Sequence, residues 1–473
     1  MPHPLRIDLD REARSSLVEQ IRDGIGAAIR EGRLQPGARL PSWRDLAAQL
    51  GVARGTVRSA YDSLIDAQLI VTSGSAGTHV TDYPPTAPRA EIRASHPPLA
   101  GMFEEFSMPP AIFQMGVPAQ DAFPFKLWSR LMVRAARSAA TMPVSYPDPR
   151  GEPDLRREIA ANLALSRGIS CAASQILITS GFSGALGLVI RALRLESTTA
   201  WMEEPGFPLT RKALGFAGIT TIPVRVDAEG MVVSDALAAA PDAAFAIVTP
   251  GQQAPLGMTL SLGRRRALLD WAAQSGAWII EDDYLSELQL KGRATPALAS
   301  IDQAGRVIHI GTFSKTISPA LRLGFVVVPP ERVAQFSDVA TGLAPAPAAT
   351  VQRAVTEFLR EGHYLRHLRR MKRLYAMRRE TLRACLSNFV APVEASAGLA
   401  ILLRLPEGTS DIEIAKEALA FDMAPVALST WYSRPQAQSA GLLLGVTNLS
   451  EKRLAASCTR LEELIRQRAG RGI

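Results

Sequence analysis

Short, continuously apolar runs that alternate with helical patterns constrain the fold of this chain most strongly. Five such runs begin at Gln175, Ala244, Ala277, Arg306 and Leu323. A strand with apolar side chains on both faces must be covered on both faces, which is typical of parallel strands joined by crossover helices. The sequence therefore predicts a multidomain α/β protein in which a mostly parallel sheet has helices on both faces.

Three regions of the 473 residues differ in pattern, and at roughly 100 to 200 residues per domain this length allows several domains. Residues 1–82 contain short helical patterns and a hairpin, residues 83–110 are rich in proline, and residues 111–473 contain the apolar runs. We interpret residues 83–110 as a linker. For residues 102–108, packing against the third region as an irregular arm is the alternative. A basic helix, strands and an amphipathic helix after Tyr364 predict a smaller C-terminal α+β subdomain.

The net charge and the cysteines indicate the cellular compartment and the class of partner to expect. The formal net charge of +8 favours a nucleic-acid partner, although many basic enzymes have a similar charge. The three cysteines lie far apart without metal-ligand spacing, which predicts a reducing cytoplasm and no metal site. No stretch approaches the roughly 18 apolar residues that span a membrane, so we expect a cytoplasmic protein with no membrane partner.

The first region has the spacing of a winged helix-turn-helix. Apolar residues from Leu17 to Ile29 recur every four positions and predict one amphipathic helix that stops near Gly32. A second helix opens at Ser42, and a third runs from Arg54 to about Ala67 after a tight turn. Strands over residues 69–72 and 78–81 would form the wing.

The third region contains the residue types that a pyridoxal phosphate site needs. Lys315 follows a predicted strand, and as an uncharged amine it can attack the cofactor's aldehyde. The hydroxyl of Ser314 and the guanidinium of Arg322 can hold the phosphate. Asp282 ends another buried strand, where a carboxylate can keep a pyridine nitrogen protonated, and Tyr284 follows it.

Two further segments fit the same cofactor less specifically. At Ser180-Gly-Phe-Ser183 a strand breaks and a helix begins, so backbone N–H groups can cradle a phosphate. Phe207 follows a Pro-Gly turn and can stack on the pyridine ring, with ordinary core packing as the alternative. Each segment alone is weak support, because many strand-to-helix turns and buried aromatic residues look the same.

Four strings together carry a resemblance to a known family. They are Leu40-Pro-Ser-Trp-Arg-Asp-Leu, Tyr146-Pro-Asp-Pro-Arg-Gly, Glu281-Asp-Asp-Tyr and Gly311-Thr-Phe-Ser-Lys. The first region resembles a GntR-type winged helix, and the third resembles a fold-type I aminotransferase domain. Joined in this order, the chain is similar to the MocR family of bacterial transcriptional regulators.

The resemblance implies a role for each matching residue. Lys315 would hold pyridoxal phosphate as an aldimine, Asp282 would pair with the pyridine nitrogen, and Tyr284 would contact the phenolic oxygen. A homodimer is implied, with Tyr146 reaching the partner subunit's site, together with a small-molecule effector. The full set of expected cofactor contacts is Ser180, Gly181, Phe182, Ser183, Phe207, Asp282, Tyr284, Thr312, Ser314, Lys315, Arg322 and Tyr146.

The resemblance also implies operator DNA as a partner. Matching positions in GntR-like winged helices contact double-stranded DNA, where arginines meet phosphates or guanine edges. For Arg44, pairing with a neighbouring acid is the alternative. The expected DNA contacts are Arg44, Arg54, Thr56 and Arg58.

One departure from the family pattern bears on catalysis. Leu443, in Leu442-Leu-Leu-Gly-Val446, occupies the position where an arginine commonly binds the amino-acid carboxylate. Leucine cannot bind a carboxylate, so we expect a sensor of pyridoxal phosphate or of an amine-type effector rather than a working aminotransferase. A working aminotransferase with an accessory DNA-binding domain is the alternative, with Arg434 or Arg211 replacing the missing arginine.

The helix from Tyr364 to Arg383 is dense in arginine. A solvated face is the usual explanation for such a run, and a second DNA-facing patch is the alternative.

Overall fold

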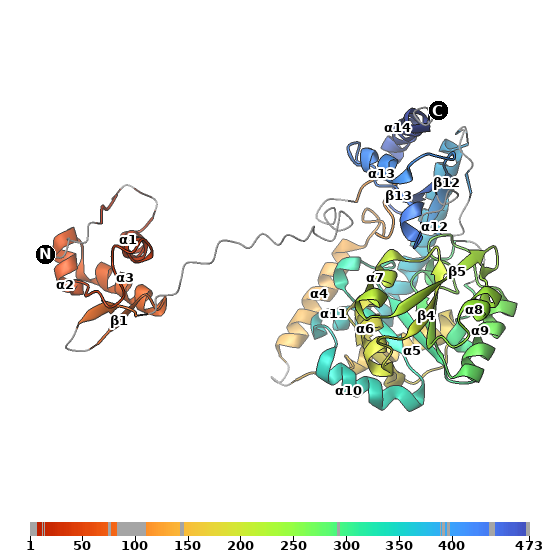
Figure 1. Cartoon of the computed structure of the whole chain (residues 1–473), viewed down its shortest axis with the longest axis horizontal. Coiled ribbons are helices and arrows are strands. Elements are labelled where there is room, and N and C mark those ends of the chain that lie inside the picture. The colour runs from red at the N-terminus through yellow and green to blue at the C-terminus, as the bar shows by residue number, and fades with distance from the viewer. Residues whose placement is uncertain are drawn as a thin grey trace. The chain divides into compact units, whose positions relative to one another are not determined.

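The chain forms two compact units, Met1–Glu105 and Phe106–Ile473 (Figure 1). The computed structural model describes residues 7–11, 13, 15–73, 77–82, 110–141, 146–290, 294–387, 389, 393–394, 398–434 and 440–469. The boundary between the units falls within residues 83–110, which we interpreted as a linker; residues 83–109 lie outside the described part of the chain.

The described part of the amino-terminal unit contains three helices and a hairpin (Figure 1). Its elements are α1 (Leu17–Arg30), α2 (Trp43–Leu50), α3 (Arg54–Asp66), β1 (Ile70–Thr72) and β2 (Thr78–Val80). Ser16 caps α1 in a capping box with Glu19, and Ser42 caps α2. The apolar stripes of the three helices meet in one core, and β1 pairs antiparallel with β2. The predicted winged helix-turn-helix is confirmed.

The second unit is built on an eight-stranded sheet in the order β3-β10-β9-β8-β7-β4-β5-β6. Strands β5, β4, β7, β8 and β9 are parallel neighbours, whereas β10 runs antiparallel to both β9 and β3. The strands are β3 (Ile176–Thr179), β4 (Thr199–Glu204), β5 (Thr220–Asp227), β6 (Gly230–Met231), β7 (Phe245–Val248), β8 (Trp278–Asp283), β9 (Val307–Thr312) and β10 (Gly324–Val327). The mostly parallel sheet is confirmed, and β4, β5 and β6 are strands that the apolar runs did not reveal.

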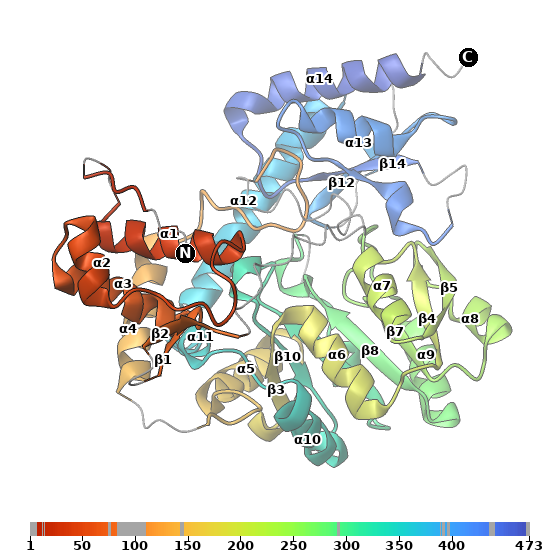
Figure 2. The same cartoon turned by 60° about the vertical axis from the view of Figure 1, so that its left-hand side comes forward.

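Helices cover both faces of this sheet, as Figure 2 shows. They are α4 (Phe125–Ala140), α5 (Pro153–Ser166), α6 (Gly181–Leu193), α7 (Pro208–Phe216), α8 (Val233–Ala239), α9 (Leu262–Ser275), α10 (Val333–Leu343) and α11 (Ala349–Arg360). Successive residues of one strand enter different cores: Leu177 packs in the core that contains residues of α6 and α10, and Ile178 packs in the core of α5 and α11. Both faces of β3 are therefore buried, which explains its continuous apolar sequence.

A smaller subdomain follows the long helix α12 (His363–Cys385). Its four strands pair antiparallel in the order β11-β12-β14-β13. The elements are β11 (Val393–Glu394), β12 (Ala400–Arg404), α13 (Asp411–Leu419), β13 (Val426–Ala427), β14 (Gly441–Gly445) and α14 (Glu451–Ala469). The predicted α+β subdomain is confirmed. No helix in the described ranges is long and apolar enough to cross a membrane.

Candidate cofactor site

The site lies where parallel strands β8 and β9 end. Asp282 pairs with Ile310 and Asp283 with Gly311, so the carboxyl ends of the two strands meet at one edge of the sheet. Lys315 follows three residues after the end of β9, and its amine interacts electrostatically with the Asp282 carboxyl. The tertiary structure thus brings together two residues that the sequence predicted for one cofactor.

Lys315 is held in an environment that favours its neutral form. Its Nζ donates a hydrogen bond to the backbone oxygen of Gly116 at 2.9 Å, from a segment about two hundred residues earlier in the chain. Burial lowers the pKa of Lys315, although the Asp282 carboxylate opposes this effect. A lysine with a lowered pKa is a stronger nucleophile at neutral pH, because more of it is uncharged.

Asp282 is buried with one oxygen lacking a partner. The residue is 8 % exposed, and its Oδ1 makes no hydrogen bond within the described residues. Burial, together with the nearby charges of Asp283 and Glu203, raises the pKa of Asp282 well above its ordinary value. A protonated pyridine nitrogen would both supply the missing partner and stabilise the carboxylate, so this carboxyl fits the predicted cofactor.

Strand register assembles the expected phosphate site. Gly324 at the start of β10 pairs with Thr179 on one side and with Thr312 on the other. Arg322, two residues before Gly324, therefore lies beside the start of α6, and its Nη2 donates to the backbone oxygen of Ser180 at 3.2 Å. A Cβ built on Gly181 would lie 3.7 Å from the Arg322 guanidinium carbon. The guanidinium thus lies at the amino-terminal end of a 13-residue helix, where an anion is favoured.

The other expected phosphate contacts surround the same helix start. The Thr312 hydroxyl bonds to that of Ser314 at 3.0 Å, and it also accepts from the Ser314 backbone N–H. Ser183 is exposed on the first turn of α6, whereas Phe182 packs partly against the core beneath it. Among the described residues, no side chain caps α6, so its first N–H groups are available to a ligand.

Leu443 belongs to an apolar cluster that contacts two of the expected cofactor residues, Phe207 and Tyr284. It is fully buried and packs with Ala254, Leu402, Leu428 and Trp431. Partly buried residues packed against this cluster include Met115, Phe207 and Tyr284. Phe207 lies 5.5 Å from Trp431, ring centre to ring centre, so the packing interpretation holds in this structure; stacking on a cofactor stays a prediction. Burial raises the pKa of the Tyr284 phenol.

Arg211 is committed to another contact. Its Nη2 pairs with Glu204 at 2.7 Å and also donates to the Trp431 backbone oxygen at 3.0 Å. The same carboxylate accepts a hydrogen bond from Ser433. Arg211 is therefore unsuited to replace a carboxylate-binding arginine, whereas the exposed Arg434 makes no ion pair within the described residues.

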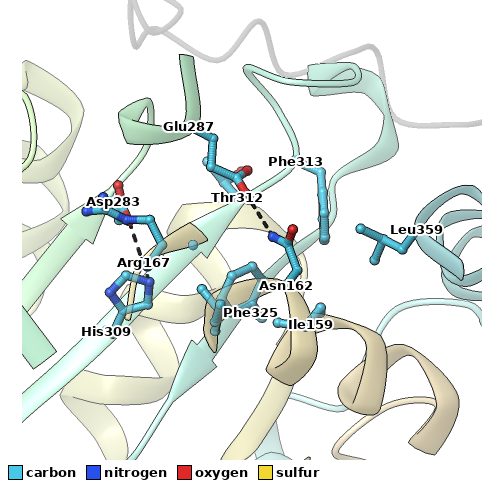
Figure 3. A pocket seen from close by; sticks show the side chains of 12 residues that line it. Ile159, Asn162, Arg167, Asp283, Glu287, His309, Thr312, Phe313, Phe325 and Leu359 are labelled. Carbon is cyan, nitrogen blue, oxygen red and sulfur yellow. Dashed lines mark hydrogen bonds and ion pairs between the residues drawn. The ribbon is translucent and has the colours of Figure 1, made fainter. Parts of the chain in front are cut away.

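Sequence reasoning missed a buried polar cluster that β8 and β9 form together with Arg167 (Figure 3). Arg167 pairs with Asp283 at 2.6 Å, and both side chains are almost fully buried. Glu281 faces His309 at 3.0 Å on the neighbouring strand. Burial raises the pKa of Glu281, but His309 and the backbone N–H groups of Leu298 and Ala299 outweigh it and lower the pKa to about 2. The three consecutive acids at the end of β8 therefore have different partners, which their spacing alone could not show.

Tyr146 is fully exposed, so its predicted contact with a second subunit stays a prediction. In the amino-terminal unit, Arg44, Arg54 and Arg58 are exposed and Thr56 is half-buried at the start of α3. Arg44 lies over the Trp43 ring at 4.8 Å and has no acidic partner among the described residues. The alternative of an ion pair at Arg44 is therefore not observed. Clusters of His, Cys, Asp and Glu suited to a metal ion are also absent from the described residues.

Two family models match the chain. The model "Bacterial regulatory proteins, gntR family" matches residues 17–80, and "Aminotransferase class I and II" matches residues 123–429. The chain is 35 % identical over 461 residues to "Probable rhizopine catabolism regulatory protein MocR" of Rhizobium meliloti, covering 94 % of this chain and 92 % of that protein. It is 33 % identical over 387 residues to "HTH-type transcriptional regulator TauR" of Rhodobacter capsulatus, covering 78 % and 79 %. Identity to "HTH-type pyridoxine biosynthesis transcriptional regulator PdxR" of Corynebacterium glutamicum is 32 %, covering 81 % and 82 %.

Solved structures show the fold of the second unit. An archaeal alanine:glyoxylate aminotransferase superposes with a TM-score of 0.69 at 24 % identity, covering 77 % of this chain and 92 % of that chain. LysN, an α-aminoadipate aminotransferase from Thermus thermophilus, superposes with a TM-score of 0.70 at 24 % identity, covering 78 % and 96 %. These similarities establish a fold-type I aminotransferase-like architecture.

Proposed function

Because the chain belongs to the MocR family, in which a GntR-type helix-turn-helix is joined to an aminotransferase-like domain, we propose that it is a DNA-binding transcriptional regulator that senses pyridoxal phosphate or an amine-type effector. When bound, pyridoxal phosphate supplies an aldehyde that condenses with primary amines. The residues of this chain would bind and orient the cofactor. Ligand binding would then bias the equilibrium between arrangements of the protein that differ in DNA affinity.

The unpartnered oxygen of Asp282 is the observation that carries the cofactor assignment. A buried carboxyl without a partner costs stability, so its retention beside Lys315 indicates a ligand that supplies a positive or donor group. Lys315 would hold the aldehyde carbon, and Arg322 would hold the phosphate at the start of α6. Thr312, Ser314 and Ser180 would add hydroxyl contacts to the same phosphate.

The effector class follows from the apolar wall formed by the cluster around Leu443, against which the expected cofactor contacts Phe207 and Tyr284 pack. Leu443 and its neighbours Ala254, Leu402 and Trp431 offer no cation, and Arg211 is already paired with Glu204. A carboxylate placed against this wall would lose its hydration without gaining a partner. We therefore expect the effector to be an amine that lacks an α-carboxylate, or pyridoxal phosphate itself.

An active aminotransferase is the alternative, favoured by the fold of the second unit. It requires a carboxylate-binding group, for which Arg434 is the remaining candidate. Sustained conversion of an amino acid and a 2-oxo acid, lost in Arg434→Ala, would establish the enzyme and displace the sensor.

The remaining parts of the proposal concern partners and location. Arg44, Arg54, Thr56 and Arg58 would contact operator DNA from the start of α2 and α3. We expect a cytoplasmic homodimer in which Tyr146 reaches the partner subunit's cofactor.

The test is the visible absorption spectrum of purified protein with pyridoxal phosphate, compared with Lys315→Ala. We expect a band that requires Lys315 and that amines shift, whereas α-amino acids leave it unchanged. If no Lys315-dependent band forms, the cofactor assignment is wrong. A response to α-amino acids alone would refute the effector class but leave the cofactor intact.

A further inference from the structure

Helix α12 presents a row of arginines to solvent. Arg366, Arg369, Arg370 and Arg373 are all exposed, and their spacing places them on one face of the helix. Arg378 and Arg379, which the sequence grouped with them, are instead buried. The explanation of the run as a solvated face is therefore wrong for Arg378 and Arg379, whereas Arg383 is exposed.

The exposed arginines are largely unneutralised. Arg366 contacts the His363 ring at 2.6 Å and the Glu361 backbone oxygen at 3.0 Å. Within the described ranges, Arg369, Arg370 and Arg373 have no acidic partner, whereas other exposed arginines of this unit, such as Arg225 and Arg360, are paired. Like charges three or four residues apart on a helix destabilise it by roughly 0.2–0.5 kcal/mol per pair. Such a row indicates an anionic partner that offsets the repulsion.

The positive surface continues onto α4. Arg130, Arg134 and Arg137 line a groove together with Glu361 and His363, which lie where α11 ends and α12 begins. Arg134 pairs with Glu357 and Glu361, while no acid among the described residues pairs with Arg130 or Arg137. The Arg134–Glu361 pair links α4 to the end of α11, and His363, at the start of α12, contacts Arg366. We call the exposed set Arg130, Arg137, Arg366, Arg369, Arg370 and Arg373 the arginine surface.

We propose that the arginine surface binds the phosphate backbone of the DNA that flanks the operator. Residues seven positions apart on a helix are separated by about 10.5 Å, so the row suits a repeating anion better than a single phosphate. The same surface of a second copy would place arginine against arginine, which disfavours an interface between copies. The inference rests on the proposed DNA-binding function and adds a sequence-independent contact from the aminotransferase-like unit.

The test compares Arg369→Gln/Arg370→Gln/Arg373→Gln with a control that removes the same charge elsewhere. The control, Arg191→Gln/Arg225→Gln/Arg266→Gln, changes exposed arginines on α6, β5 and α9. Each full-length protein is titrated with an operator selected from random duplex DNA, as a minimal fragment and with long flanks, over a range of salt concentrations. Circular dichroism and sedimentation verify folding and oligomeric state.

On the long fragment, the wild type and the control should bind alike, and the α12 variant should bind at least about tenfold more weakly at low salt. For the α12 variant, the slope of log affinity against log salt should become shallower by about 0.9 for each lost phosphate contact, and by up to about 2.7 if all three arginines make one. On the minimal fragment the three proteins should agree. Equal slopes on the long fragment, or a variant that changes only the oligomeric state, would overturn the inference. Failure of the wild type to select any operator would instead refute the proposed function.

Discussion

At the scale of single residues, the site contains ionisable groups whose buried surroundings destabilise the charge that each group carries in water. Burial lowers the pKa of Lys315 and raises that of Asp282, so each tends toward its neutral form before a ligand arrives. Glu203 lies nearby, and its carboxylate accepts from the Thr249 hydroxyl and backbone N–H. Burial raises the pKa of Glu203 to about 7, although these hydrogen bonds oppose the change. A ligand that supplied the opposite charge would offset the free-energy cost of burying these groups.

Asp282→Asn should separate stability from cofactor binding. Without cofactor, we expect the variant to be more stable than the wild type at pH 8 by about 1–3 kcal/mol, because an unpaired buried carboxyl is removed. Affinity for pyridoxal phosphate should fall by about tenfold or more, because the pyridine nitrogen loses its anionic partner. Thermal unfolding and absorption titration measure the two effects. A loss of stability without cofactor would show that Asp282 has a structural partner.

Glu203→Gln should change how stability depends on pH. A carboxyl whose folded pKa lies above its unfolded value binds more protons in the folded state, so stability falls as pH rises from about 4.5 to about 7. The variant removes this decline and should be more stable than the wild type at pH 8 by on the order of 3 kcal/mol. Denaturant unfolding at pH 5 and pH 8 checks this. An equal difference between the two proteins at both pH values would contradict it.

At the scale of elements, the pairing of β10 with both β3 and β9 builds the expected phosphate site. Gly324 allows close approach: a Cβ there would lie 2.9 Å from the Gly311 backbone oxygen and 3.1 Å from the Gly181 backbone. Gly181 has a φ of +78° and begins α6. Because its backbone lies this close to Gly324, its position depends on the absence of a side chain at Gly324. The helix start, the hydroxyls after β9 and Arg322 are thereby held within one cradle.

Gly324→Ala should displace the start of α6 and weaken phosphate binding. We expect affinity for pyridoxal phosphate to fall by about tenfold, since the added methyl group forces the Gly181 backbone away from Arg322. The control is Gly342→Ala on α10, where a Cβ has no atom within 4 Å and alanine favours the helix. Equal affinities of the two variants, measured by equilibrium titration, would argue against this role of Gly324.

At the scale of the whole molecule, the chain combines a small helix-turn-helix unit with a larger aminotransferase-like unit, and the two have separate cores. Tyr146 is fully exposed in the segment that leads into α5. Its proposed contact with the cofactor of a second subunit depends on assembly. This makes assembly part of the proposed function.

Tyr146→Phe should lower cofactor affinity by about fivefold, the effect of losing one neutral hydrogen bond. Mixing this variant with Lys315→Ala tests whether the contact crosses the subunits. In a mixed dimer, the site that retains Lys315 receives an intact Tyr146 from its partner, so wild-type affinity should return at that site. If mixing restores nothing while sedimentation shows mixed dimers, Tyr146 does not act across the interface.

The sequence by itself determined the two-domain organisation, the winged helix, the buried strands and the position of Lys315 after β9. These features depend on local periodicity and on spacing within a short segment, so the sequence of that segment is enough to predict them. Strands β4 and β5 escaped because β4 ends in two glutamates and β5 contains Pro223, so neither looks like a buried strand. Only the tertiary structure decided that Arg167 pairs with Asp283, that Arg378 is buried, and that Leu443 faces the apolar cluster with Phe207 and Tyr284. Such contacts join residues far apart in the chain. No local pattern encodes the strand register and the packing of distant segments that select one partner among many.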